Sequence, residues 1–270
     1  MTTFSVLLSL YKKEHACYLE ACLKSLHKQT YPANEIIMVI DGPIPKELHR
    51  VLKEWEIKLP LVKVQLSENV GLGKALNEGL KFCTNDIVAR MDTDDICHKD
   101  RFFKQIKYMD ENPFVGLISS AVGEFKNNPS DIYAWRKLPL THNEIIEFSK
   151  KRNPFNHMAV MFRKNLVEKA GAYQSEYLYE DYALWVRMIQ NGVTTANLPD
   201  ALVFARTGNG MAERRSGLKY ARSEYLAQVK FFKTGHLTIV ELIRNLAIRL
   251  PLRLFPLPIL SLLYSTILRK

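Results

Sequence analysis

The residues with the clearest chemical potential are three aspartates, Asp92, Asp94 and Asp95, which follow a short apolar segment at residues 86–90. The composition of that segment is typical of a buried strand. Side chains two residues apart on a strand point the same way, so Asp92 and Asp94 can offer oxygen ligands to one Mg²⁺ or Mn²⁺ ion. Three close carboxylates repel one another when no cation is bound. The alternative is a solvated acidic turn, in which aspartate is common.

A second acidic pair, Glu180 and Asp181, precedes a segment with helical spacing at residues 182–191. The helix dipole favours acidic side chains in a first turn, so the residues alone favour a structural role. Arg187, two turns further along, could pair with these acids or bind phosphate. His157 lies in an irregular segment, where a structural histidine bonded to backbone is as plausible as a functional one.

Phosphate-binding potential is concentrated around residues 69–74 and at Arg90. Asn69, Gly71 and Lys74 belong to a loop between a predicted strand and a predicted helix. Glycine lets the backbone approach a ligand closely, and a helix N-terminus favours an anion. A plain helix-capping loop is the alternative. Arg90 could bind phosphate or neutralise the nearby aspartates.

Strands and helices alternate at short spacing along the first half of the chain, which predicts parallel β-α-β units in one sheet. The predicted strands are residues 4–10, 35–40, 62–66, 86–90 and 115–120. The predicted helices are residues 18–29, 46–58, 73–81, 101–111, 144–150, 166–170, 182–191 and 217–233. Ligands bind outside the carboxyl ends of such strands. Asp41 and the aspartates of residues 92–95 both follow strands, so we expect them to share one rim.

Five segments resemble motifs of the family 2 glycosyltransferases in their order and spacing: residues 4–11, 35–41, 69–79, 90–95 and 180–181. The resemblance covers roughly residues 3–205. It is closest to bacterial enzymes that build O-antigen, capsule or exopolysaccharide repeat units. It implies an α/β protein with the GT-A fold, a Rossmann-like and mostly parallel central sheet flanked by helices.

The resemblance also implies a role for each acidic residue near the donor. Asp92 and Asp94 resemble the DxD motif, in which Asp94 would ligate the metal that bridges two phosphates, and Asp92 would contact the ribose or the metal shell. Asp95 would orient its neighbours or the donor sugar. Asp41 resembles the carboxylate that hydrogen-bonds uracil, although an aspartate before Gly-Pro can equally cap a turn. The residues assigned to the nucleotide sugar are Ser9, Tyr11, Asp41, Asn69, Gly71, Lys74, Arg90, Asp92 and Asp95.

On the acceptor side, the resemblance makes Asp181 the base that deprotonates the acceptor hydroxyl. Glu180 would position the acceptor or hold Asp181, and His157 and Arg187 are further acceptor candidates. Inversion needs one base, one in-line attack and help for the departing nucleoside diphosphate, which Mn²⁺ or Mg²⁺ would supply. The QxxRW motif of processive synthases is missing, so we expect the enzyme to add one sugar and release its product.

The implied reaction moves one hexose from a nucleoside-diphosphate sugar to a polyprenyl-diphosphate-linked saccharide. We expect the donor to be UDP-linked (UDP-Gal, UDP-Glc or related). A sugar-nucleotide nucleotidyltransferase is one alternative, since it also uses a metal and an α/β fold. That class usually opens with a glycine-rich phosphate loop, however, and residues 5–13 contain no glycine. A non-catalytic, membrane-bound sugar- or lipid-binding module is the second alternative.

The C-terminal part of the chain differs from the rest in charge. The net charge is +10, and residues 211–270 carry eleven basic and three acidic residues, which leaves residues 1–210 near neutrality. We therefore predict a GT-A domain over residues 1–210 and a basic, amphipathic helical tail over residues 211–270. Residues 254–268 are largely apolar but contain two prolines, and they fall short of the about 20 residues that span a bilayer.

Arg244, Arg249 and Arg253 stand among the apolar residues of this tail, which indicates attachment to an anionic membrane surface. A helix packed on the body of the protein is the alternative. Nucleic acid fits less well, because no aromatic stacking platform accompanies the charges. A polyprenyl-linked acceptor would place the protein peripherally on the cytoplasmic face of the inner membrane. The four cysteines lack metal-ligand spacing, which fits a reducing compartment.

Overall fold

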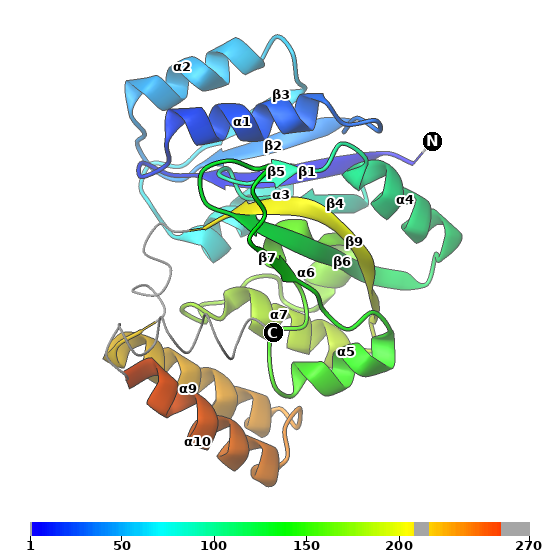
Figure 1. The fold of residues 1–270 in the computed structure, drawn as a ribbon, viewed down its shortest axis with the longest axis vertical. Coiled ribbons are helices and arrows are strands. Elements are labelled where there is room, and N and C mark those ends of the chain that lie inside the picture. The colour runs from blue at the N-terminus through cyan, green and yellow to red at the C-terminus, as the bar shows by residue number, and fades with distance from the viewer. Residues whose placement is uncertain (1, 208–215, 255–270) are drawn as a thin grey trace.

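The computed structural model describes residues 2–207 and 216–254, which form one sheet with helices on both faces and a pair of C-terminal helices (Figure 1). The strands are β1 (Phe4–Leu10), β2 (Glu35–Ile40), β3 (Leu61–Gln65), β4 (Ile87–Arg90), β5 (Ile96–Cys97), β6 (Val115–Phe125), β7 (Ala134–Arg136), β8 (Met161–Arg163) and β9 (Thr194–Arg206). The helices are α1 (Ala16–His27), α2 (Lys46–Trp55), α3 (Leu72–Phe82), α4 (Arg101–Glu111), α5 (His142–Ser149), α6 (Lys164–Lys169), α7 (Glu180–Gln190), α9 (Leu218–Lys233) and α10 (Ile239–Leu254). A short 3₁₀ helix, η1 (His157–Ala159), precedes β8.

The sheet has nine strands in the order β3-β2-β1-β4-β8-β6-β9-β5, with β7 paired to β6. The strands β3, β2, β1 and β4 run parallel, because α1, α2 and α3 each return the chain to the same edge. β8 is antiparallel to both β4 and β6, whereas β9 is parallel to β6. β5 and β7 add further antiparallel pairs. The predicted α/β class and parallel N-terminal half are confirmed, and the second half of the sheet is mixed.

The inner strands β1, β2 and β4 of the parallel half are covered on both faces, which explains their nearly unbroken apolar sequences. Along β1, Val6 and Leu8 share a buried cluster with residues of α1 and α2. Leu7 points the other way and packs with Leu76 of α3. A methyl group added to Gly79 of α3 would lie 2.5 Å from Leu7 Cδ1, so glycine permits this close helix–sheet contact. The strand ends are therefore held on a rigid platform.

Most predicted helices and strands are present within a few residues of their expected bounds, but β5, β7, β8 and β9 were missed. β9 is the longest of these strands, and it contains Asn197, Pro199 and Asp200, which indicate a loop. Its pairing along nearly the whole of β6 overrides those local preferences. Strand formation here depends on a partner that is distant in sequence, which a local pattern does not reveal.

The helices α9 and α10, which we call the C-terminal hairpin, lie side by side, and α9 packs against α7 (Figure 1). Ala227 and Phe231 of α9 share a buried cluster with Tyr182 of α7. Residues 216–254 are therefore packed on the body of the protein, whereas the packed-helix alternative for residues 254–268 falls almost entirely outside the described residues. α10 continues through Pro251. Because Pro251 lies in the last turn of the described helix, little of α10 depends on the backbone donor that it lacks.

The predicted domain boundary at residue 210 and nearly all of the apolar segment at residues 254–268 lie outside the described residues. Within the described ranges, none of the helices combines the length and the apolar character needed to cross a membrane. The division into a GT-A domain and a membrane-associating tail therefore stays a prediction.

Candidate active site

A cleft of about 900 Å³ opens at the carboxyl ends of β1, β2 and β4. All of the predicted site residues except Lys74 and Arg187 line it. These are Ser9, Tyr11, Asp41, Asn69, Gly71, Arg90, Asp92, Asp94, Asp95, His157, Glu180 and Asp181. The expectation that Asp41 and the aspartates of residues 92–95 share one rim is met, because the strands that precede them run parallel.

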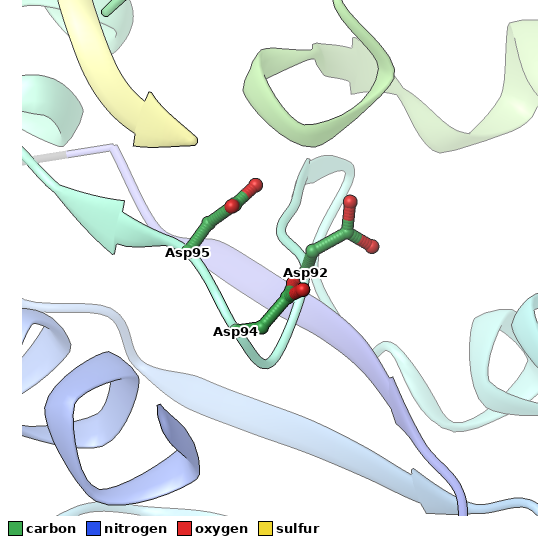
Figure 2. A group of neighbouring side chains, drawn as sticks. All are labelled: Asp92, Asp94 and Asp95. Atoms are coloured by element: carbon green, nitrogen blue, oxygen red, sulfur yellow. The ribbon is translucent and has the colours of Figure 1, made fainter. Parts of the chain in front are cut away.

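The three aspartates lie on the turn between β4 and β5, and one carboxylate oxygen of each lies within 4.8 Å of the others (Figure 2). Burial, together with the charge of Asp92, raises the pKa of Asp94 to about 7. Burial, followed by the charges of Asp92 and Asp94, raises the pKa of Asp95 well above its ordinary value. Ionised together, these groups repel one another, and a hard divalent cation would relieve that repulsion. The donor set therefore fits Mg²⁺ or Mn²⁺.

Arg90 is buried beside this cluster, with 1% of its surface exposed. Its Nη2 pairs closely with Asp92, whereas Nε and Nη1 have no hydrogen-bond partner among the described residues. Buried donors without acceptors are costly, so the guanidinium group is suited to an anionic ligand that enters the cleft. The structure shows the predicted neutralisation of an aspartate by Arg90. Phosphate binding stays a prediction.

Arg206, at the end of β9, supports the acidic turn from the opposite side. Its backbone N–H donates to Asp95 Oδ1 at 2.8 Å, and its Nε donates to the Asp94 carbonyl at 3.2 Å. The guanidinium group lies between two rings, 3.9 Å from the centroid of Tyr18 and 4.6 Å from that of Phe125. Arg206 was not identified from the sequence, because β9, the strand that positions it, was not predicted. The available signal was a basic residue that ends the apolar segment at residues 201–205.

Asp41 is 3% exposed and uses its carboxylate to hold the neighbouring loop. Its Oδ1 accepts a hydrogen bond from the Val70 N–H at 2.7 Å. Its Oδ2 accepts from Asn69 Nδ2 at 2.8 Å and from the Gly71 N–H at 3.2 Å. These bonds hold the loop of residues 69–71 and not the turn before Gly-Pro, so the turn-capping alternative for Asp41 stays untested. Its contact with a base stays a prediction, since Asp41 also lines the cleft.

The acid pair begins α7 and lines the same cleft. Asp181 accepts hydrogen bonds from Asn153 Nδ2 and from the Tyr182 N–H, both at 2.7 Å. Burial, followed by the nearby charge of Asp181, raises the pKa of Glu180. A methyl group placed on Gly73 would lie 3.4 Å from Glu180 Cβ, so the starts of α3 and α7 are neighbours. Two helix N-termini therefore face the cleft, which favours an anionic ligand there.

His157 also lines the cleft, and it contacts aromatic residues. Its Nε2 is 2.9 Å from the Tyr173 hydroxyl, and its ring makes an edge contact with Trp185 at 6.0 Å between centroids. Burial, together with the charge of Arg90, lowers the pKa of His157 well below its ordinary value. A neutral imidazole that already has a hydrogen-bond partner is consistent with the structural interpretation, and its acceptor role stays a prediction.

Two predicted site residues lie away from the cleft. Lys74 lines a separate hollow beside Glu68 and Glu78, because its side chain leaves α3 on the outer face. Arg187 was expected to pair with the acid pair or with phosphate. It instead donates to the carbonyls of Ala170 and Ala172 and pairs with Glu176 at 2.8 Å. It thereby fixes the loop between α6 and α7, and the prediction of its direct contact with the acid pair is wrong.

Several residues that line the cleft were not anticipated from the sequence: Lys13, Glu14, His15, Arg136, Arg206 and Tyr220. Glu14 accepts a hydrogen bond from the Thr93 hydroxyl at 2.5 Å and so contacts the acidic turn. These residues come from loops, from β7 and β9, and from α9, where no motif marks them. For Lys13, Glu14 and His15, the one indication in the sequence was the run of charged and titratable side chains at residues 12–15, just after β1.

The protein combines a Rossmann-like sheet with an acidic turn and an acid pair in one cleft, the arrangement expected of a GT-A glycosyltransferase. Residues 5–168 match the family model described as "Glycosyl transferase family 2", and the chain belongs to that family. The protein is therefore an enzyme of the glycosyltransferase class. Family membership sets aside both alternatives, the nucleotidyltransferase and the non-catalytic binding module.

The chain is similar over nearly its whole length to two relatives with assigned names. It is 47% identical to the amylovoran biosynthesis glycosyltransferase AmsE of Erwinia amylovora, covering 97% of this chain and 98% of the relative. It is 39% identical to the UDP-Gal:alpha-D-GlcNAc-diphosphoundecaprenol beta-1,3-galactosyltransferase of Escherichia coli, covering 99% of this chain and 97% of the relative.

Solved structures show the same fold at lower identity. The mannosyltransferase PcManGT of Pyrobaculum calidifontis, in complex with GDP-Man and Mn²⁺, matches with a TM-score of 0.70 and 19% identity, covering 98% of this chain and 75% of that one. This likeness confirms the predicted GT-A fold.

Proposed function

We propose that this enzyme transfers one hexose from a UDP-sugar to a polyprenyl-diphosphate-linked saccharide, with inversion, in the synthesis of a surface polysaccharide. The observation that carries the proposal is the placement of the acidic turn and the acid pair in one cleft. The names of the two relatives support the same substrate classes, since one uses UDP-Gal and a GlcNAc-diphosphoundecaprenol acceptor and the other serves amylovoran biosynthesis.

The donor is proposed to bind at the acidic turn. Asp94 and Asp92 would hold Mn²⁺ or Mg²⁺, and the bound ion would stabilise negative charge on the departing nucleoside diphosphate. The unpartnered nitrogens of Arg90 would face the same phosphates. Ser9, Tyr11 and the loop held by Asp41 would form the nucleotide slot.

The acceptor is proposed to enter on the side of α7. Asp181 would remove the proton of the acceptor hydroxyl as its oxygen attacks the anomeric carbon of the donor. The bond from that carbon to the diphosphate breaks with its electron pair leaving on the nucleotide. A single displacement of this kind inverts the anomeric centre. Glu180 would position the hydroxyl or Asp181, and the missing QxxRW motif favours release after one addition.

The enzyme is further proposed to act peripherally at the cytoplasmic face of the inner membrane, where a polyprenyl-linked acceptor would be found. The C-terminal hairpin exposes apolar side chains, including Val240 at 72% and Ile243 at 60%. Exposed apolar residues on a basic amphipathic helix favour an interfacial location. Three of the arginines first assigned to the membrane are not available for it, since Arg244, Arg249 and Arg253 contact other groups of the protein.

The proposed reaction can be tested with purified enzyme, Mn²⁺, a set of UDP- and GDP-sugars, and a synthetic acceptor that carries GlcNAc on a diphosphate-linked alkyl chain. We expect transfer from one UDP-hexose, loss of turnover in EDTA, and an anomeric configuration in the product opposite to that of the donor by NMR. Retention of configuration, or equal turnover in EDTA, would contradict the proposal. Transfer to a GlcNAc acceptor that lacks the diphosphate, at the same efficiency, would contradict the acceptor class.

A further inference from the structure

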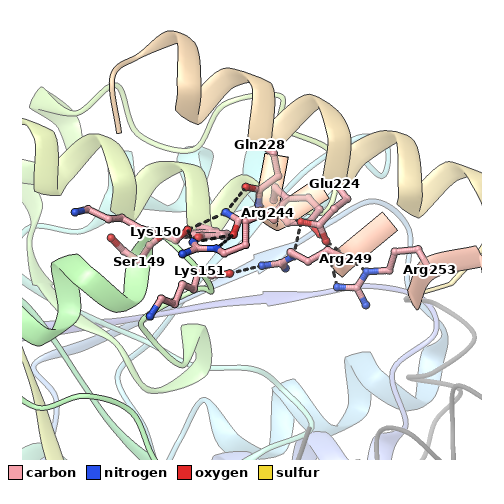
Figure 3. Close-up of polar contacts among 11 residues, drawn as sticks. Ser149, Lys150, Lys151, Glu224, Gln228, Arg244, Arg249 and Arg253 are labelled. Atoms are coloured by element: carbon pink, nitrogen blue, oxygen red, sulfur yellow. Dashed lines mark hydrogen bonds and ion pairs between the residues drawn. The ribbon is translucent and has the colours of Figure 1, made fainter. Parts of the chain in front are cut away.

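Glu224 of α9 is a carboxylate buried within the C-terminal hairpin, with none of its surface exposed. Two arginines of α10 neutralise it (Figure 3): Arg249 Nε lies 2.8 Å from its Oε1, and Arg253 Nη2 lies 3.2 Å from its Oε2. The hydroxyl of Tyr179 also donates to Oε2. A buried carboxylate without such partners would strongly destabilise the fold. This network therefore fixes α9, α10 and the start of α7 relative to one another.

Tyr179 connects this network to the active site. It is the N-cap residue of α7, directly before Glu180 and Asp181. The residue before it, Leu178, has a φ of +67°, a left-handed conformation that is unfavourable for a residue other than glycine. Such a conformation persists where the surrounding structure restrains it. The hydrogen bond from the Tyr179 hydroxyl to buried Glu224 is a restraint of this kind, placed next to the acid pair.

Tyr220 shows that the hairpin itself reaches the cleft. It lies in the first turn of α9 and lines the cleft together with the acid pair. Its ring makes an edge contact with Tyr179 at 5.8 Å between centroids. The Arg253 guanidinium group lies over the same ring, 4.5 Å from its centroid. The network around Glu224 and the wall of the cleft are therefore continuous.

We propose that Glu224 is a positioning residue, which acts through Tyr179 to hold the first turn of α7 and the acid pair in place for the acceptor. The C-terminal hairpin is then part of the catalytic unit and not only a means of attachment. The family model ends at residue 168, so this arrangement belongs to a part of the chain beyond the match. The inference rests on the proposed function in one respect, the role of Asp181 as base.

The test compares two variants that each remove one contact between α7 and the hairpin. Tyr179→Phe removes only the hydroxyl that binds Glu224. Gln190→Ala removes the hydrogen bond from Gln190 Nε2 to the Thr234 carbonyl, 2.6 Å long, at the opposite end of α7. With UDP-Gal and the GlcNAc-diphosphate acceptor, we expect Tyr179→Phe to lower kcat by roughly tenfold with the donor KM unchanged. Gln190→Ala should keep the wild-type kcat.

Amide hydrogen exchange provides a readout that needs no activity. In Tyr179→Phe, exchange should accelerate at Ala183 and Leu184 in the first half of α7, whereas Gln190→Ala should affect only its last turn. Glu224→Gln should reproduce both effects of Tyr179→Phe if it folds. The proposal is overturned if folded Tyr179→Phe matches the wild type in kcat and in first-turn exchange, or if the two variants lower kcat equally. A wild-type protein without transferase activity would contradict the proposed function instead, and the exchange comparison would still decide the role of Tyr179.

Discussion

At the scale of single residues, Asp94 would couple the binding of a divalent cation to the pH. Its pKa is raised from 3.8 to about 7, chiefly by burial and then by Asp92. Between these values the folded protein binds more protons than the unfolded chain, so its stability falls as the pH rises through this window. We expect the free energy of unfolding of the metal-free wild type, relative to that of Asp94→Asn, to decrease from about pH 4 to about pH 7. The comparison with Asp94→Asn cancels the opposite contribution of His157, whose pKa is lowered. Urea titrations across this range measure it.

Mn²⁺ provides the control for that prediction. The cation binds the ionised carboxylates, so its stabilising effect should be small at the acidic end of the range and large at the basic end. Asp94→Asn should flatten the pH dependence and remove most of the stabilisation by Mn²⁺. A stabilisation by Mn²⁺ that is unchanged in Asp94→Asn would show that the ion binds elsewhere.

Asp181 offers a second test at this scale, because it separates acceptor chemistry from donor binding. Asp181→Asn keeps the shape of the side chain and can still accept the hydrogen bond from Asn153. We expect the transfer rate to fall by roughly 10²–10⁴ if the group only accepts a proton. UDP binding, measured by calorimetry in the presence of Mn²⁺, should stay close to that of the wild type. Loss of UDP binding in Asp181→Asn would assign this residue to the donor instead.

The sequence could identify a site residue where that residue follows a recognisable strand or helix. Asp92, Asp94 and Asp41 follow apolar strands, so their shared rim could be predicted. Arg206 could not be found, because the strand that places it forms only through its pairing with β6. Arg187 shows the converse error, since its spacing from Asp181 suggested contact although its side chain faces the loop before α7.

At the scale of elements, the loop of residues 69–71 depends on two glycines with a positive φ, Gly42, which packs against it, and Gly71, which belongs to it. Gly42 has a φ of +83°, and a methyl group there would lie 2.6 Å from the Asn69 nitrogen. Gly71 has a φ of +88° but no atom within 4 Å of the added methyl group. Gly42→Ala must therefore displace the loop. Gly71→Ala should destabilise the fold only by the strain of a left-handed φ, about 1–2 kcal/mol.

These two glycines predict different effects on donor binding. We expect Gly42→Ala to weaken UDP binding and to lower the free energy of unfolding by more than Gly71→Ala does. Gly71→Ala should keep its affinity for UDP within a few-fold of the wild type. Calorimetry with UDP and urea unfolding of both variants test this. Equal losses of affinity would mean that the strained φ, and not the position of the loop, decides binding.

The elements themselves were predictable where a local pattern was sufficient. The bounds of β1, β2 and α4 match their predictions, because apolar runs and helical spacing mark them directly. The three-residue β7 and β8 and the two-residue β5 are too short to carry a pattern, and they exist through pairing with β4, β6 and β9. The mixed half of the sheet could therefore not be predicted from local sequence patterns.

At the scale of the whole molecule, part of the positive charge of the C-terminal part is used inside the fold. Arg249 and Arg253 neutralise Glu224 inside the hairpin, while Arg269 and Lys270 belong to residues 255–270, beyond the described part. The composition that indicated a membrane tail thus includes cations that stabilise the fold. This division changes which truncation can test membrane attachment.

Two truncations should therefore behave differently. Deleting residues 237–270 removes α10 and both arginine partners of Glu224, which should cost about 3–5 kcal/mol and leave the protein unfolded by circular dichroism. Deleting residues 255–270 leaves that network in place, so the protein should stay folded.

Binding of the shorter truncation to vesicles with anionic lipids should weaken, because it loses two cations and most of the apolar segment. The remaining binding should be sensitive to salt, since exposed charges are screened within about 10 Å at 0.1 M. Val240→Glu combined with Ile243→Glu on the exposed face of α10 should weaken it further without unfolding. A folded truncation that binds these vesicles as the full chain does would exclude residues 255–270 as the anchor, and unaltered binding by the double variant would exclude the hairpin face.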